Sequence, residues 1–558
     1  MLKYCLKYFS IFSFLLLLTV CTDKNQPQYF PNLDSITEAQ IKSDLYALAS
    51  EEMQGREAGL TGAGLAADYI THELNKINVQ SLNSHRQNGG YYQSFQIIGA
   101  DLGDVSSQLT IQKGKYKIKA KYRDDYFYFY NSPQKVSVNS EIVFTGYAIN
   151  APEYQYNDFN NLDLQDKIVV AYYGEPLQDD TLQFFNGKHQ TKYMLPDWKA
   201  DEVAKHGGRI LVLIPNPENE KSYNMFLQRR LKSNNKKPFV LIDEKSVPVI
   251  YLSVKFAQEV FGNWLKENFN SEKKRLLDWL QHTQENQFQW QEINPLNQTW
   301  KVNIEYNNPE VRECQNLIAL YPGQSSQLKN EYILVGSHYD HEGVQEGKIY
   351  LGADDNASGV SATLNVARAF AQLTGHERPN RSIIFAFWDA EEKGTLGTKY
   401  FIQHSVVPLP NIKAVFNMDM VGRDASFNFA ALRQPIKDEN AENKVMIFYS
   451  AQAPALKDIA IKSNKNIDLT LLYDPNVFFT SGSDHVVFHS HHIPVIYYFT
   501  GFHTDYTSVG DTPDKINYSK LTRISRHIAN FLYTLANSNE IPDFNRNILS
   551  APEGDFRM

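Results

Sequence analysis

The sequence predicts an α/β fold: an open, mostly parallel mixed sheet flanked by helices, with a β-rich α+β domain inserted before its main part. From Tyr332 onward, apolar strand-like segments alternate with segments of helical periodicity, which is typical of such a sheet. Between residues 141 and 252 the apolar runs are short and strand-like. With 558 residues, 42% of them hydrophobic, the chain is long enough for more than one domain.

The individual elements follow from the spacing of the apolar residues. Residues 36–78 show the three- and four-residue spacing of helices. Beyond them, strands are expected at Tyr332–Gly336, Ser382–Trp388, Ala414–Met418 and Ile493–Phe499. Helices are expected at Ser358–Gln372, Thr395–Gln403 and Ser519–Ala536. In the middle region, strands are expected at 141–147, 167–171, 209–214 and 247–252, with a helix over Trp198–His206.

These patterns divide the chain into five parts. The parts are an export signal at 1–21, the first part of the α/β domain at 35–130, the inserted domain at 131–295, the main part of the α/β domain at 300–537, and a C-terminal tail at 538–558.

The N-terminus has the pattern of an export signal. Lys3 and Lys7 precede an apolar run from Phe9 to Val20, which is too short to span a bilayer comfortably, and polar sequence follows at once. The segment Leu18–Cys21 resembles a bacterial lipoprotein cleavage box, although Val20 stands where a small residue is usual. We therefore expect an exported protein that is periplasmic, attached to the outer membrane through a lipidated Cys21, or secreted.

Charge and cysteine content narrow the class of function. A net charge of −8 with a pI near 6.0 argues against a nucleic-acid partner, since phosphates require a basic face. Cys5 and Cys21 lie in the signal region, so Cys314 alone remains in the mature chain. There is thus no disulfide framework and no thiolate metal site, and any metal must be held by His, Asp and Glu.

Side chains that can bind metal follow every expected strand of the α/β part. They are His338 and Asp340 after the first strand, Glu391 and Glu392 after the second, Asp419 after the third, His503 after the last, and Asp354 and Asp355 before the helix near Ser358. Ligands bind beyond the carboxyl ends of the strands in open α/β sheets. Each residue alone would more often be a turn former or a surface residue, but together they predict a metal site.

The spacing of these residues also fits metal chemistry. In a strand, His338 and Asp340 point to the same side, so that Asp340 can hold the second imidazole nitrogen and fix the tautomer. Glu391 and Glu392 are adjacent and point in opposite directions, so one can bind a metal while the other takes a proton from an activated water. The further histidines His341, His485, His489, His491 and His492 are interpreted mostly as structural.

The motifs resemble those of the co-catalytic two-zinc aminopeptidase family, which includes secreted bacterial leucyl and aminopeptidase S-type enzymes. They are Ser337–Asp340, Gly352–Gly359, Trp388–Glu392, Asn417–Asp419 and Gly501–His503, with earlier similarity at Leu48–Arg56, Ala66–Ile70 and Tyr92–Gln96. The resemblance covers about Ile36–Ala536, and its middle region is similar to a protease-associated domain. It implies a zinc exopeptidase fold and peptide substrates.

The resemblance also implies a role for each site residue. Asp354 would bridge two zinc ions, with a cis peptide bond after it. His338 and Asp419 would complete one set of protein ligands, and Glu392 and His503 the other. Glu391 would be the general base. Asp340 would support His338 through the imidazole nitrogen that does not bind metal. The remaining assignments are Asp355 and Asp484 on the substrate side of the cleft, and His485 as the alternative to His503.

Other functions remain open at this stage. The sequence favours an aminopeptidase, but the same site could serve a carboxypeptidase or a dipeptidase. Less favoured are a glutaminyl cyclase, which resembles a one-zinc version, a receptor-like relative without catalysis, and a binding protein built on the inserted domain. Cobalt or manganese could replace zinc at such ligands.

Overall fold

The computed structural model describes most of the chain. The described residues are 29–82, 90–100, 105–176, 185, 191–232, 237–282, 288, 298–475, 477, 483–539, 541–545 and 548. The expected export signal, including Cys21, and most of the tail lie outside them. In the described part, no helix has the length and apolar character needed to cross a membrane.

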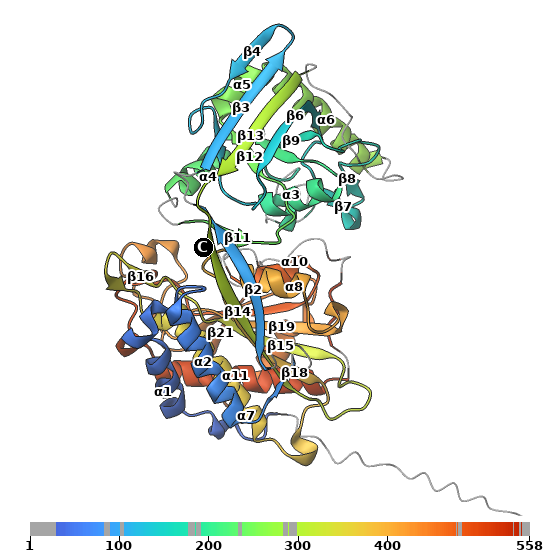
Figure 1. The fold of residues 1–558 in the computed structure, drawn as a ribbon. Helices are drawn as coiled ribbons and strands as arrows, with labels where there is room; N and C mark the ends of the chain where they lie inside the picture. The colour runs from blue at the N-terminus through green and yellow to red at the C-terminus, as the bar shows by residue number, and fades with distance from the viewer. Residues whose placement is uncertain are drawn as a thin grey trace, which may run out of the picture.

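Two sheets organise the molecule, each in its own domain (Figure 1). The sheet of the main domain has the order β11-β2-β14-β18-β15-β19-β22-β20-β21, with β1 paired to β14. Its strands are β1 (Gln80–Ser81), β2 (Tyr92–Gly99), β11 (Phe239–Leu241), β14 (Glu310–Tyr321), β15 (Tyr332–His338), β18 (Ser382–Trp388), β19 (Ile412–Met418), β20 (Lys444–Tyr449), β21 (Thr470–Asp474) and β22 (Val495–Phe499). Its helices are α1 (Glu38–Leu48), α2 (Thr61–Lys76), α7 (Gly359–Ala371), α8 (Leu396–Gln403), α9 (Ala455–Ser463), α10 (His485–Ser490) and α11 (Tyr518–Asn537).

The four expected strands of the α/β part are confirmed, and they form the parallel centre of the sheet. β18, β15, β19 and β22 are neighbours and run parallel to one another. The sheet is otherwise mixed, because β14 and β2 extend it antiparallel on one side and β20 pairs antiparallel with β22 on the other. The four strands whose carboxyl ends carry the expected site are therefore all parallel to one another, and β20 and β21 form a further parallel pair at one edge of the sheet.

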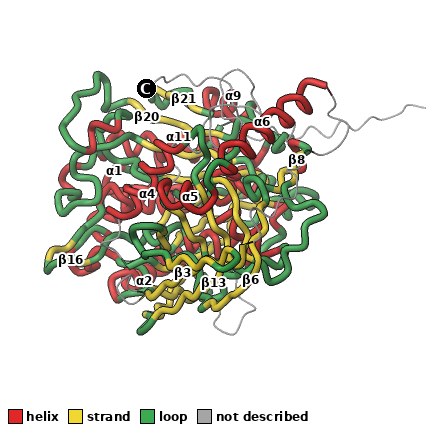
Figure 2. Tube along the Cα trace, turned by 90° about the horizontal axis from the view of Figure 1, so that it is seen from above, coloured by secondary structure: helices red, strands yellow, loops and turns green. Residues whose placement is uncertain are grey.

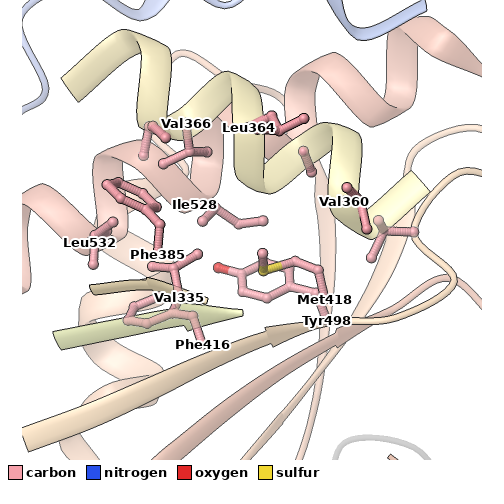
Figure 3. Close-up of a cluster of buried hydrophobic side chains, with 14 of the residues drawn as sticks. Val335, Val360, Leu364, Val366, Phe385, Phe416, Met418, Tyr498, Ile528 and Leu532 are labelled. Atoms are coloured by element: carbon pink, nitrogen blue, oxygen red, sulfur yellow. The ribbon is translucent and has the colours of Figure 1, made fainter. Parts of the chain in front are cut away.

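Helices cover both faces of this sheet because alternate strand residues point to opposite sides. Ile333 and Val335 of β15 pack in a core with α1, α2, α7, α9 and α11, whereas Leu334 packs on the other face with residues of α8 and α10. Figure 3 shows the first of these cores, in which Val335, Phe385 and Phe416 of the sheet meet Val360 and Leu364 of α7 and Ile528 of α11. The strand ends are therefore held rigidly from both sides.

The insert domain contains the second sheet, with the order β4-β3-β13-β6-β9-β10-β12-β5. Figure 2 looks down on β3, β13 and β6, which lie side by side. The strands are β3 (Val105–Lys113), β4 (Tyr116–Lys119), β5 (Tyr126–Tyr128), β6 (Val136–Phe144), β9 (Ile168–Tyr172), β10 (Ile210–Ile214), β12 (Val249–Leu252) and β13 (Gln298–Tyr306), with a separate pair β7 (Asn150–Ala151) and β8 (Tyr156–Asn157). The helices are α3 (Pro196–Lys205), α4 (Glu220–Lys232), α5 (Val254–Phe261) and α6 (Trp264–His282).

The structure shifts the boundaries expected for this domain. β3 and β4 precede residue 131 and β13 follows residue 295, yet all three belong to the second sheet. The insert domain thus spans 105–306 rather than 131–295. One segment is an exception, since β11 lies inside this range but forms the edge strand of the main sheet beside β2.

Candidate metal site

The expected metal-binding side chains converge at the carboxyl ends of the four parallel strands. His338 ends β15, Asp419 follows β19 directly, and Glu391 and Glu392 lie in the loop after β18. The segment Ala353–Ser358, which precedes α7, brings Asp355 to the same point. These side chains are buried or nearly so, because helices cover both faces of the sheet.

The first group of possible ligands consists of His338, Asp355 and Asp419. His338 Nε2 lies 3.4 Å from Asp419 Oδ1 and 3.5 Å from Asp355 Oδ1. The opposite ring nitrogen, Nδ1, lies 3.2 Å from the backbone carbonyl of Asp340 and 3.7 Å from its carboxylate. Asp340 thereby contacts Nδ1, and Nε2 faces the carboxylates of Asp355 and Asp419.

The second group consists of His341, Asp355 and Glu392. His341 Nδ1 lies 2.9 Å from Glu392 Oε1 and 3.7 Å from Asp355 Oδ2. The two oxygens of Asp355 therefore face different histidines, Oδ1 toward His338 and Oδ2 toward His341. Asp355 is shared between the groups, which is the geometry that a bridging carboxylate requires.

The shared residue is thus Asp355, whereas the sequence analysis placed the bridge at Asp354. Asp354 turns away from both groups: its Oδ1 accepts the backbone N–H of Gly422 at 2.7 Å, and its Oδ2 lies 3.2 Å from His503 Nε2. The cis peptide bond is also one residue further on than expected, between Asp355 and Asn356. The backbone of Asp355 and Asn356 departs from helical φ and ψ, which separates the directions of the two adjacent aspartates.

His503 is not in either group among the described residues. It lies beside Asp354, and its Nδ1 is buried without a hydrogen-bond partner. His485 is not at the site either, because its Nε2 lies 2.9 Å from the carbonyl of Val477 and its ring stacks on Tyr497. The structural interpretation of His485 is therefore consistent with its contacts.

The groups fit metal ions by the chemistry of their donors. His338 Nε2 and Asp419 Oδ1 are buried and have no hydrogen-bond partner, which is unusual for polar atoms inside a protein. Burial, with the neighbouring Glu392 and Asp419 carboxylates, raises the pKa of Asp355 well above its usual value. Several buried acids so close together need positive charge, which metal ions at imidazole and carboxylate ligands supply.

Glu391 lies beside the first group without belonging to it. Its Oε2 is 3.9 Å from His338 Nε2, and it lines the adjacent cleft. Burial raises the pKa of Glu391 well above its usual value, and Asp484 adds to this effect. Asp484 itself is buried, where its Oδ1 accepts a hydrogen bond from the Thr398 hydroxyl at 2.9 Å.

Backbone amides hold the loops that carry these side chains. The Asp340 carboxylate accepts the N–H groups of Glu391 at 3.0 Å and Glu392 at 3.2 Å. Asp511 Oδ2 accepts those of Asp354 at 2.9 Å and Asp355 at 3.1 Å. Asp340 therefore ties the β15 loop to the β18 loop, a more extensive role than the expected support of His338 alone.

Arg56 holds the same loops from the N-terminal side. Its buried guanidinium donates to the backbone carbonyls of Tyr339 at 2.8 Å, Gly352 at 2.9 Å, Leu351 at 2.7 Å and Leu48 at 2.6 Å. Burial lowers the pKa of Arg56 to about 10, so that it stays protonated at neutral pH and adds a positive charge beside the acids. This side chain fastens the N-terminal helices to the two segments that carry His338 and Asp355.

A cleft of about 720 Å³ opens beside these groups, between the two domains. Asp355, Glu391, Glu392 and Asp419 lie on its main-domain wall. The opposite wall comes from the insert domain, with the side chains Phe129, Trp198, Phe226, Arg230 and Tyr251. The cleft combines an acidic end with a more apolar, aromatic wall, which is the composition of a site for an organic ligand.

Sequence reasoning missed several residues of this site. His341 stood among the histidines interpreted mostly as structural, although it follows His338 by only three positions. Asp511 gave no signal, because it lies after all the expected strands and acts through backbone amides. Arg56 stood in one of the segments that carry the family resemblance, but its partners are carbonyl groups that no side-chain pattern shows.

Comparison with known proteins agrees with this site. Residues 316–532 match the model of Peptidase family M28. This range contains the residues of both groups as well as Glu391, Asp354 and His503. It leaves out Arg56 and the whole of the insert domain.

Individual relatives are similar over short stretches only. A probable zinc metalloprotease of Pyrenophora tritici-repentis is 35% identical over 102 residues, which are 18% of this chain and 23% of the relative. A glutamate carboxypeptidase 2 homolog of Caenorhabditis briggsae is 31% identical over 130 residues, 23% of this chain and 16% of the relative. The chain thus spans less than a quarter of the length of these curated relatives. Among solved structures, an aminopeptidase from Aneurinibacillus sp. strain AM-1 aligns with 92% of this chain and 97% of its own, at 17% identity and a TM-score of 0.44.

The two adjacent aspartates can be separated by experiment. Asp355→Asn should weaken zinc binding at both groups, because each loses a charged ligand, whereas Asp354→Asn should leave both groups with their donors. The measurement is zinc bound per chain after dialysis against a series of free-zinc concentrations. Loss of both ions from Asp354→Asn, with normal binding by Asp355→Asn, would return the bridge to Asp354.

Proposed function

We propose that this chain, whose residues 316–532 form a Peptidase family M28 domain, is a zinc-dependent exopeptidase that acts as an aminopeptidase. The observation that carries the proposal is the pair of ligand groups that share Asp355, with Glu391 beside them on the wall of the cleft. This arrangement supports two metal ions per chain.

His338 and Asp419 would hold one zinc, Glu392 would hold the other, and Asp355 would bind both. The geometry brings His341 to the second position, while the family resemblance assigns that position to His503, whose buried Nδ1 has no partner. When bound, zinc ions at such a site polarise the scissile carbonyl and lower the pKa of the attacking water.

Glu391 is placed to act as the general base. It is buried, lines the cleft and stands next to the ligand groups without being part of one. Its carboxylate accepts a proton from the water that attacks the peptide carbonyl and returns it to the amine that leaves. The backbone N–H groups of Glu391 and Glu392 donate to the Asp340 carboxylate, which fixes the backbone of the loop that carries Glu391.

The charges near the site favour the free amino end of a peptide. A free α-carboxylate would need an available cation, and the two nearest candidates from the sequence are in ion pairs. Arg423 pairs with Asp505 at 2.8 Å, and Lys393 pairs with Glu57 at 3.1 Å. The acidic groups at the end of the cleft instead suit an α-ammonium group.

The alternatives are less consistent with this geometry. A one-zinc cyclase would need a single ligand group, whereas two groups that share one carboxylate occur here. A receptor-like relative would not need a buried Glu391 beside them. A carboxypeptidase or dipeptidase on the same metal groups is the second candidate, because Arg230 lines the cleft on its insert-domain wall.

Export and lipid attachment at Cys21 stay predictions from the sequence alone. On the basis of the N-terminal pattern, we propose that the protein acts outside the cytoplasm. A protease-associated role for the insert domain is likewise a proposal, based on sequence resemblance and on the wall that this domain contributes to the cleft.

Glu391→Gln should abolish peptide hydrolysis and leave zinc content and thermal unfolding unchanged, because it removes a proton acceptor and not a ligand. The fall in kcat should reach or exceed the general-base factor of about 10²–10⁴. A matched control is Glu305→Gln, an exposed residue of β13. Near-normal kcat in the Glu391 variant would refute its role as the base.

The polarity is tested with one pentapeptide in free, N-acetylated and C-amidated forms. An aminopeptidase cleaves the free and amidated peptides and spares the acetylated one, because the acetylated peptide alone lacks an α-ammonium group. Mass spectrometry of the products shows which end shortens. Loss of C-terminal residues from the acetylated peptide would establish carboxypeptidase polarity while leaving the metal site in place.

A further inference from the structure

The insert domain sends one strand into the main sheet. β11 lies within the insert domain in sequence, yet it pairs antiparallel with β2, with Phe239 opposite Gly99 and Leu241 opposite Ile97. In Figure 1, β11 lies at the junction between the two domains, next to the end of β2. The insert domain is therefore fastened to the main domain by backbone hydrogen bonds next to the cleft.

Phe239 of this strand belongs to the same apolar cluster as the ends of the loop that carries Glu391 and Glu392. It shares a small apolar cluster with Ala390 and Leu396, which lie on either side of that loop. The loop is closed where the N–H of Leu396 donates to the carbonyl of Ala390 at 3.0 Å. Phe239 is 5% exposed and also lines the cleft, as do Glu391 and Glu392 of the loop.

Charged groups hold the same ring in place. The Arg312 guanidinium lies 4.5 Å from the centre of the Phe239 ring, and Lys393 Nζ lies 6.0 Å from it. Both cations pair with Glu57, at 2.9 Å for Arg312 and 3.1 Å for Lys393. Lys393 directly follows Glu392. The Phe239 ring therefore contacts the residue next to a proposed metal ligand.

Because Gly99 has no side chain, the Phe239 ring can lie directly against its backbone. A Cβ atom added at Gly99 would stand 2.7 Å from Cε1 of that ring, closer than real Cβ contacts allow. Alanine fits the extended backbone of β2, so this substitution acts chiefly by displacing the ring. The chain thus offers a way to move Phe239 without altering it.

From these contacts we infer that Phe239 is a positioning residue, through which the insert domain holds Glu391 in its working orientation. The inference rests on the proposed function for the meaning of that orientation. The Asp340 carboxylate accepts hydrogen bonds from the amides of Glu391 and Glu392, and the apolar cluster that contains Phe239 also contains the two ends of the loop, Ala390 and Leu396. The insert domain is in this respect a support for the catalytic loop and not only a wall of the cleft.

The test compares Phe239→Ala and Gly99→Ala with Val240→Ala, using the full-length zinc-loaded protein. Val240 lies on the same strand but packs in the core of the insert domain. The first readout is hydrogen–deuterium exchange at the amides of Gly394, Thr395 and Leu396, which donate to loop carbonyls. Exchange there should be faster in the Phe239 and Gly99 variants and as in wild type in the Val240 variant.

The second readout separates kcat from KM and from zinc content. Displacement of the general base should lower kcat roughly 10–100-fold in the two ring variants, with zinc per chain unchanged. Phe239→Leu, which keeps an apolar side chain, should recover part of the loss. Wild-type exchange at residues 394–396 in both ring variants would overturn the inference. If the wild-type protein hydrolysed no peptide, the proposed function would fall, and the exchange comparison would still decide whether Phe239 supports the loop.

Discussion

The arrangement of the main domain depends on holding a dense set of buried acids at one edge of a sheet. Asp340, Asp355, Glu391, Asp419, Asp484 and Asp511 are all buried there. Unpaired carboxylates at such depth and spacing would take up protons or disrupt the fold. Pairs of backbone N–H groups donate to the carboxylates of Asp340 and Asp511 and balance part of this negative charge. The buried Arg56 adds a positive charge. We propose that metal ions balance the rest of the negative charge, which is consistent with a buried His338 Nε2 that faces two carboxylates without a hydrogen bond.

Much of this could be predicted from the sequence, because the strands and the site share one signal. An apolar strand followed at once by a metal-capable side chain identified β15, β18 and β19 together with His338, Glu391 and Asp419. The predictions that differ from the structure concern local backbone geometry. Asp354 and Asp355 are identical neighbours, and only the non-helical backbone at Asp355 and Asn356 shows which of them faces the histidines. His341 was hidden because its position depends on how the loop after β15 turns, which spacing does not reveal.

The domain boundaries failed for a related reason. Strand patterns show that a segment is extended but not which sheet it joins. β3 and β13 were assigned to the main domain by their position in the chain, although they pair with each other and with the insert domain. Conversely, β11 lies deep inside the inserted region and pairs with β2. Pairing between distant segments is set by tertiary packing, so an inserted domain that also contributes a strand to its host sheet leaves no simple boundary in the sequence.

We propose that two metal ions share Asp355 at the carboxyl ends of the parallel strands. A crystal structure of the zinc-soaked protein, with anomalous data collected on both sides of the zinc absorption edge, tests it most directly. We expect two anomalous peaks about 3.5–4 Å apart, each next to an oxygen of Asp355. The map would also show whether His341 or His503 completes the second ligand set. A single peak, or two peaks joined through Asp354 with Asp355 turned away, would contradict it.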